Sequence, residues 1–253
     1  MIHVLLNGYN NPYVIRKAVE RFYEQTDLEG LEIGSFTLID SLYPFPLGKF
    51  DDNRNEMVSI ALDHNWSYLR LDKNLGQNGN FNTLVDWLKA NKKLSRNDTI
   101  AFWEPDSNVT HRSWLKACEI LFEKAYHHCG FITPGRKPDW IMTNQGAERE
   151  VAGIKVRPLC WPGGWPMGIY RWGFIEDMKQ LPVSHQYYGG TEGNILHCLN
   201  VTNHIGLMMT EILDPGTNEG FDPEYIGWKA ETIRLPSSEQ LDFEAWARKR
   251  MGQ

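Results

Sequence analysis

The sequence predicts an α/β fold in which a mostly parallel sheet carries helices on both faces. Over the first hundred residues, short apolar runs alternate with longer segments whose apolar positions recur at helical spacing. The chain has 253 residues and is 42% hydrophobic and 12% aromatic, which is enough apolar material for a sizeable core. The turn after the first strand reads Asn-Gly-Tyr-Asn-Asn and lacks the G-x-G-x-x-G spacing, so a dinucleotide-binding version of this fold is disfavoured.

The predicted elements follow one another in a β-α-β-α order. Strands are expected at residues 3–6, 35–39, 67–71 and 99–103, and helices at 13–25, 55–64 and 81–90. The first of these helices places Val14, Ala18, Val19 and Phe22 on one face. Stretches rich in glycine, proline, asparagine or aspartate at 7–12, 43–53 and 74–80 predict loops. Further along, a helix is expected at 194–199, a strand at 205–213 and an exposed helix at 237–250.

An acidic motif directly follows the fourth strand, at Glu104-Pro105-Asp106-Ser107. Carboxylates two positions apart at the end of a strand point to one side and can reach a common point outside the sheet. Hard cations such as Mg²⁺ take oxygen ligands and commonly hold substrate phosphates. Because open α/β sheets bind ligands at the carboxyl ends of their strands, the motif predicts a metal–diphosphate site. An ordinary acidic turn is the alternative.

Charge, hydropathy and cysteine usage exclude several classes of protein. The net charge is −6, so the chain lacks the basic balance of a general nucleic-acid binder. No apolar run approaches the roughly 18 residues of a membrane span, and the chain begins with a strand-like segment rather than a leader. The four cysteines form no C-x-x-C pair, which favours reduced thiols and a cytoplasmic location.

Five short motifs, in order between about residues 2 and 230, resemble those of the GT-A class of nucleotide-sugar glycosyltransferases, most closely glycosyltransferase family 2. They are Leu-Leu-Asn-Gly-Tyr-Asn at 5–10, Leu-Ile-Asp-Ser at 38–41, the asparagine and glycine pattern at 74–82, Phe-Trp-Glu-Pro-Asp at 102–106 and Gly-Gly-Thr-Glu at 189–192. The first lacks the family's usual proline, the second has one Asp where the family often has two, and the fourth has Glu in place of the first Asp of D-x-D. The resemblance implies a Rossmann-like GT-A sheet with an acceptor-side α+β extension.

The resemblance also implies roles for individual residues. Asp106 would bind Mn²⁺ or Mg²⁺ directly, with Glu104 beside the ribose or the metal, and Glu192 would take the acceptor's proton as the catalytic base. Glu192 also fits a helix N-terminus, where a negative charge is favoured. The residues expected to contact the donor are Gly8, Tyr9, Asn10, Asp40, Asn74, Gly76, Asn82, Glu104, Trp165 and Lys229.

The segment 161–172 contains three Trp and one Tyr among glycines and prolines, and we expect neither a regular helix nor a strand there. Its indoles could stack on a sugar or brace a loop.

The resemblance places a third metal ligand, often His, after the strand at 205–213, near Asp214. The candidates His185, His197 and His204 all lie elsewhere in the sequence.

The implied function is metal-dependent, inverting transfer of a sugar from a nucleoside diphosphate, with UDP as the leading candidate, to a hydroxyl of a glycan or another soluble acceptor. Transfer to hydroxymethylated DNA, as in phage enzymes, is the runner-up. A nucleotidyltransferase and an inactive carbohydrate-binding module are further alternatives. The expected organisation is one GT-A domain over 1–253, with a nucleotide-sugar half at 1–110, an acceptor-side half at 111–235 and a C-terminal helix at 236–253.

Overall fold

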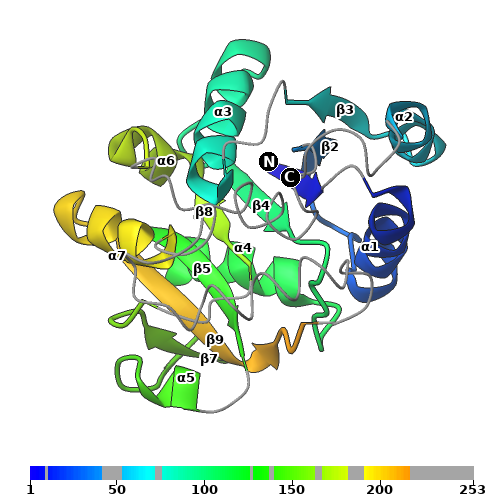
Figure 1. Cartoon of the computed structure of the whole chain (residues 1–253). Helices are drawn as coiled ribbons and strands as arrows, with labels where there is room; N and C mark the ends of the chain where they lie inside the picture. Colours follow the sequence, from blue (N-terminus) through cyan, green and yellow to red (C-terminus); the bar gives the residue numbers. More distant parts are fainter. Residues whose placement is uncertain are drawn as a thin grey trace, which may run out of the picture.

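The structure is a computed structural model that describes residues 1–8, 11–41, 53–71, 76–125, 128–136, 140–162, 167–181 and 191–216 (Figure 1). Within these ranges the strands are β1 (Ile2–Gly8), β2 (Ile33–Asp40), β3 (Ser67–Arg70), β4 (Thr99–Trp103), β5 (Cys129–Gly135), β6 (Arg149–Val151), β7 (Ile154–Pro158), β8 (Ile169–Arg171) and β9 (Ile205–Leu213). The helices are α1 (Pro12–Gln25), α2 (Arg54–Asp63), α3 (Gly76–Asn91), α4 (Trp114–Lys124), α5 (Trp140–Thr143), α6 (Trp172–Met178) and α7 (Thr191–Val201).

The strands form one sheet in the order β3-β2-β1-β4-β8-β5-β9-β7-β6. Strands β3, β2, β1 and β4 are parallel to one another, and β5 is parallel to β9. Strand β8 lies between β4 and β5 and is antiparallel to both, while β7 and β6 form an antiparallel edge beside β9. The predicted α/β class is confirmed, but the sheet formed by the described residues is mixed, with four parallel and four antiparallel strand pairings.

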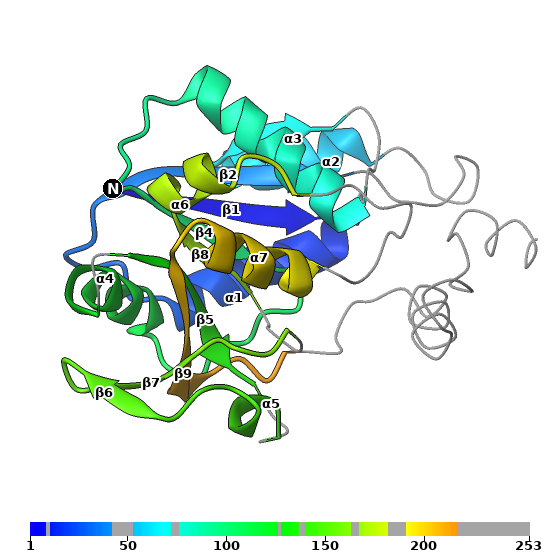
Figure 2. The same ribbon diagram turned by 90° about the vertical axis from the view of Figure 1, so that its left-hand side faces the viewer.

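Helices cover both faces of this sheet, as the predicted fold requires (Figures 1 and 2). On one face α1, α2 and α4 bury Phe22, Met57 and Leu121 against the sheet. On the other face α3, α6 and α7 bury Leu84, Phe174 and Ile195. The apolar positions of each helix recur at three- and four-residue spacing, which turns one stripe toward the sheet.

The boundaries of the predicted elements need three corrections. Helix α3 begins at Gly76 rather than at residue 81, so it takes in part of a predicted loop. Helix α7 spans Thr191–Val201, longer than the predicted 194–199. The segment 161–172 was expected to be irregular, but Ile169–Arg171 forms β8 and Trp172 begins α6. The glycines and prolines of this segment precede residue 169, and the β-prone Ile169 and Tyr170 pair with strands on both sides.

No helix in the described part of the chain is long and apolar enough to cross a membrane. The predicted division at residue 110 remains a prediction, and the predicted C-terminal helix lies outside the described residues.

Candidate active site

The acidic motif after β4 forms a tight turn at the carboxyl end of the strand. The backbone N–H of Ser107 donates to the carbonyl of Glu104 (3.0 Å), and the Glu104 N–H donates to Ser107 Oγ (3.2 Å). Arg21 of α1 braces the turn, since its Nη1 donates to the carbonyls of Pro105 (3.2 Å) and Ser107 (3.0 Å). These four hydrogen bonds fix the backbone from which the carboxylates of Glu104 and Asp106 project.

A third carboxylate, Asp214, lies at the end of β9 beside this turn. Its Oδ1 accepts hydrogen bonds from the N–H groups of Asn108 (2.8 Å) and Gly216 (2.9 Å). Its Oδ2 is buried and has no hydrogen-bond partner among the described residues. Burial raises the pKa of Asp214, and the neighbouring Asp106 raises it further. Sequence reasoning searched this position for a histidine and missed the aspartate that occupies it.

The same acidic surroundings act on Glu104. Burial, followed by the charges of Asp106 and Asp214, raises the pKa of Glu104 to about 8. Three carboxyl groups held this close repel one another, so a cation among them would be favoured. Carboxylate oxygens are also the ligands that Mg²⁺ and Mn²⁺ prefer. The orphaned Oδ2 of Asp214 and this donor set therefore fit a hard divalent cation.

No three His, Cys, Asp or Glu side chains within the described ranges are already arranged to hold a metal by themselves. A cation here would complete its coordination with oxygens from a ligand, as Mg²⁺ commonly does with substrate phosphates. His204 is not placed to bind this cation, because it precedes β9 at the opposite end of the strand from Asp214. Its ring packs against that of Phe174, with 5.2 Å between the ring centroids. His197 lies within α7, and His185 lies outside the described residues.

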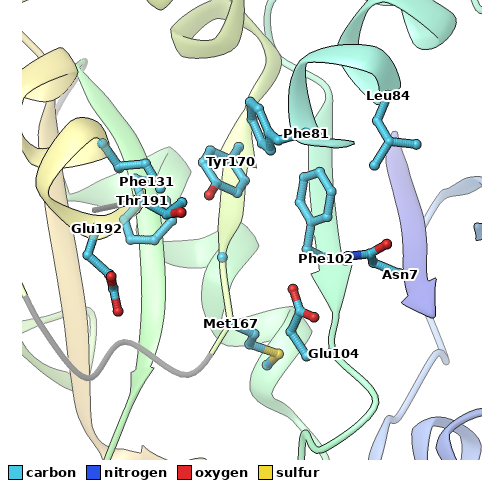
Figure 3. Close-up of a pocket in the computed structure, with 12 residues that line it drawn as sticks. Asn7, Phe81, Leu84, Phe102, Glu104, Phe131, Met167, Tyr170, Thr191 and Glu192 are labelled. Atoms are coloured by element: carbon cyan, nitrogen blue, oxygen red, sulfur yellow. The ribbon is translucent and has the colours of Figure 1, made fainter. Parts of the chain in front are cut away.

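A pocket opens beside the acidic turn and brings Glu104 and Glu192 to one space (Figure 3). Figure 3 shows the two carboxylates on opposite sides, with Tyr170 and Met167 between them. The pocket is lined by Asn7, Phe81, Leu84, Phe102, Glu104, Phe131, Met167, Gly168, Tyr170, Thr191, Glu192 and Ile195. Glu192 and the metal motif were expected to serve one reaction, and the structure places Glu192 and Glu104 in one pocket.

Tyr170 forms the floor of this pocket. Its ring packs against Phe131 (4.9 Å between centroids), Phe81 (5.4 Å) and Phe102 (5.5 Å). Burial raises the pKa of Tyr170, and Glu104 and Glu192 add to that rise, so the hydroxyl stays protonated and can donate a hydrogen bond. Sequence reasoning did not single out Tyr170, because strand β8 was not predicted.

Glu192 lies in the first turn of α7, directly after Thr191. A carboxylate there is stabilised by the helix dipole, so both predicted roles for Glu192, catalytic base and helix-terminal charge, stay open. Two other carboxylates, Glu176 and Asp177 of the preceding helix α6, form ion pairs with Arg96 (3.1 and 2.7 Å) at an exposed position. Neither residue lines the pocket.

Several residues predicted to contact the nucleotide lie at the carboxyl ends of β1 and β2. Asp40 is fully buried, and its Oδ2 accepts a hydrogen bond from the Tyr68 hydroxyl (2.9 Å), with Arg70 Nε at 3.8 Å. These contacts fit a structural role as well as the predicted contact with the donor. Gly8 packs closely against Ile15, since a Cβ at residue 8 would lie 2.1 Å from Cδ1 of Ile15 and that side chain would have to shift.

The remaining predicted residues divide between described and undescribed parts. Gly76 begins α3, and Asn82 within it uses its side-chain amide to bind the backbone of Leu181. Trp172, one of the three tryptophans of 161–172, is buried in the core. The predicted residues outside the described part of the chain are Tyr9, Asn10, Asn74, Trp165 and Lys229.

Similarity to solved structures identifies the fold. The chain matches the mannosyltransferase PcManGT from Pyrobaculum calidifontis, solved with GDP-Man and Mn²⁺, with a TM-score of 0.62 at 14% identity. That match covers 98% of this chain and 69% of the other. It also matches GalNAc-T7, solved with UDP, GalNAc and Mn²⁺, with a TM-score of 0.60 at 11% identity over 100% of this chain and 54% of the other.

A third similar structure is glucosyl-3-phosphoglycerate synthase from Mycobacterium tuberculosis, solved with Mg²⁺ and UDP, with a TM-score of 0.52 at 11% identity. It covers 92% of this chain and 76% of the other. No family model and no curated protein matches the sequence. At these identities the similarity establishes the architecture, and the chain has the GT-A fold of nucleotide-sugar glycosyltransferases.

Proposed function

We propose that the chain is a metal-dependent glycosyltransferase that moves a sugar from a nucleoside diphosphate to a hydroxyl acceptor. The observation that carries this proposal is the cluster of Glu104, Asp106 and Asp214 beside a pocket that also contains Glu192. The similar structures named above were solved with Mn²⁺ or Mg²⁺ and a UDP or GDP ligand, which supports the same chemistry on this fold.

In this proposal Asp106 and Asp214 hold the cation, and Glu104 assists from the pocket side. A divalent cation bound there would neutralise negative charge on the departing diphosphate as the sugar–phosphate bond breaks. The buried Oδ2 of Asp214, which lacks a partner in the described structure, gains one when the cation binds. The donor is a UDP-sugar, and Asp40 accepts a hydrogen bond from its base.

The acceptor approaches the sugar from the side of α7. Glu192 takes the proton of the attacking hydroxyl, and the Tyr170 hydroxyl donates a hydrogen bond to a sugar oxygen. A base on the face opposite the leaving diphosphate gives inversion at the anomeric carbon. The aromatic side chains that line the pocket offer ring faces to sugar C–H groups and keep water away from the reacting atoms.

The deciding experiment incubates the purified chain with a panel of UDP- and GDP-sugars in the presence of Mn²⁺, Mg²⁺ or excess EDTA. We expect slow donor hydrolysis with at least one sugar when either metal is present, and none in EDTA. Addition of glycan acceptors should convert hydrolysis to transfer, and the anomeric configuration of the product reports inversion. Undiminished activity in EDTA, or release of pyrophosphate from a nucleoside triphosphate and a sugar phosphate, would contradict the proposal.

A further inference from the structure

One face of helix α3 contacts two points of the chain, Leu181 shortly after α6 and Thr191 at the start of α7. Asn82 Nδ2 donates to the carbonyl of Leu181 (2.8 Å), and the Leu181 N–H donates to Asn82 Oδ1 (2.8 Å). One turn earlier, Asn78 Oδ1 accepts a hydrogen bond from the Thr191 hydroxyl (2.8 Å). Residues four apart lie on the same side of a helix, so both contacts come from a single stripe of α3.

These contacts are buried, which makes them strong determinants of position. Asn78, Asn82 and Thr191 are 7%, 8% and 9% exposed, and Leu181 is 2% exposed. A buried amide or hydroxyl that loses its partner keeps its desolvation cost, so alternative placements of these groups are disfavoured. Asn82 pairs with both backbone groups of Leu181, as a neighbouring strand would, and this fixes the direction of the chain as well as its distance.

These contacts affect the position of Glu192. It directly follows Thr191 and reaches the pocket from the first turn of α7. The body of α7 is held by apolar packing of Ile195 and Leu199, one and two turns further on. Its first turn is tied to α3 by the hydrogen bond from Thr191 to Asn78.

We propose that Asn78 and Asn82 are positioning residues that hold Leu181 and Thr191 against α3 and thereby fix Glu192 at the pocket. The catalytic part of this inference rests on the proposed function, and the anchoring part does not. It also reassigns Asn82, whose expected role was contact with the donor, because its donor and acceptor atoms are both used by Leu181.

The test compares Thr191→Val with Thr191→Ser and Asn82→Ala with Asn82→Asp in the full chain. Thr26→Val is the matched control, because the Thr26 hydroxyl accepts a buried bond from Trp114 Nε1 (3.0 Å) on the other face of the sheet. Hydrogen exchange of the peptide containing residues 191–201 is measured for each variant without ligand. We expect faster exchange in Thr191→Val, Asn82→Ala and Asn82→Asp, and wild-type exchange in Thr191→Ser and in the control. In Asn82→Asp one carboxylate oxygen can keep the bond from the Leu181 N–H, but the other cannot donate to the Leu181 carbonyl and repels it.

Kinetics and donor affinity then separate positioning from direct contact. Small displacements of a catalytic group can lower turnover by up to about 10²-fold, so we expect kcat to fall about 10- to 100-fold in Thr191→Val and Asn82→Ala. The donor Kd, measured by calorimetry with Mn²⁺, should stay within about two-fold of wild type, and Thr191→Ser should restore kcat.

Unchanged exchange of the α7 peptide would overturn the inference, whatever activity the protein has. A loss confined to donor affinity in Asn82→Ala would also overturn it and return Asn82 to the donor site. If only the proposed function is wrong, the result is different. Neither wild type nor any variant then shows turnover, while the differences in hydrogen exchange between the variants persist.

Discussion

At the scale of single residues, the site is defined by carboxylates that are costly to hold together. Asp214 keeps one oxygen on two backbone N–H groups and buries the other beside Asp106. Packing of the core fixes the strand ends and so holds these charges together. The stability of that core offsets the local repulsion between them. This is the pattern expected where a protein gives up stability locally to bind a cation.

Asp106→Asn is expected to abolish metal-dependent turnover while the fold survives. The change keeps the shape of the side chain and removes the charge that is proposed to hold the cation, in the turn after β4. Turnover and Mn²⁺ affinity by calorimetry are measured on one sample, with circular dichroism to confirm folding. Asp63→Asn serves as the control, because Asp63 is an exposed carboxylate paired with Arg16 at the end of α2. Wild-type turnover in Asp106→Asn would remove Asp106 from the metal site.

The buried imidazole of His3 predicts loss of stability on mild acidification. Burial lowers the pKa of His3, its Nδ1 meets Ser35 Oγ at 2.8 Å, and its Nε2 is buried without a partner among the described residues. A base with a lowered folded pKa contributes fully above its unfolded pKa of about 6.5, and its contribution is lost as the pH falls through the folded value.

The free energy of unfolding should therefore fall between about pH 7 and pH 5, and less steeply in His3→Asn than in wild type. Urea unfolding of both proteins at the two pH values measures the difference. Superimposable pH dependences would show that His3 does not titrate in this range. The pKa of His204 is also lowered by burial, so a His204→Asn variant is the second comparison.

At the scale of elements, the sequence pattern predicts what depends on local periodicity and misses what depends on neighbours. The runs at 35–39 and 99–103 are long enough to mark strands β2 and β4, and the helical spacing in 13–25 marks α1. Strand β8 has three residues and is stabilised by β4 and β5 on its two sides, so no local pattern marks it. Tyr170 and the pocket floor were missed for that reason.

Glu192 in the first turn of α7 has two possible roles, catalytic base or helix-terminal charge, and one substitution distinguishes them. If Glu192 takes the acceptor proton, Glu192→Gln keeps the shape of the side chain and lowers turnover about 10²- to 10⁴-fold, with donor and metal affinity nearly unchanged. If it serves only the helix dipole, the change costs about 0.3–1 kcal/mol of stability and leaves turnover intact.

Turnover, donor affinity by calorimetry and urea unfolding of Glu192→Gln are measured together, with Glu176→Gln as the control. Glu176 is a carboxylate on α6 that pairs with Arg96 outside the pocket, so its loss should not affect turnover. Wild-type turnover in Glu192→Gln would place the base elsewhere or indicate a retaining reaction.

At the scale of the whole molecule, parallel topology explains how much of the site was predictable. Parallel strands β2, β1 and β4 end at one edge of the sheet, so Gly8, Asp40 and the acidic motif had to converge there. Asp214 belongs to the same edge because β9 runs parallel to β5, but that pairing spans long stretches of chain and leaves no local trace in the sequence.

The balance of charge over the molecule bears on the acceptor. A DNA-modifying transferase must attract a polyanion, which relies on a concentration of Lys and Arg, before it can extrude the target base. This chain has 26 Lys and Arg against 32 Asp and Glu, and the described residues that line the pocket include two carboxylates and no basic side chain. We therefore expect a neutral glycan hydroxyl to be a better acceptor than hydroxymethylated DNA.

Label transfer from the active nucleotide sugar decides between these acceptors. A panel of neutral oligosaccharides should accept label in the presence of Mn²⁺, and hydroxymethylated duplex and single-stranded DNA should not, with Asp106→Asn as the inactive control in both arms. Low salt favours binding of DNA to the protein, because each contact with a phosphate strengthens as the ionic strength falls. Transfer to DNA that rises steeply as salt is lowered, with an inert glycan panel, would reverse the assignment and require a basic surface outside the described part of the chain.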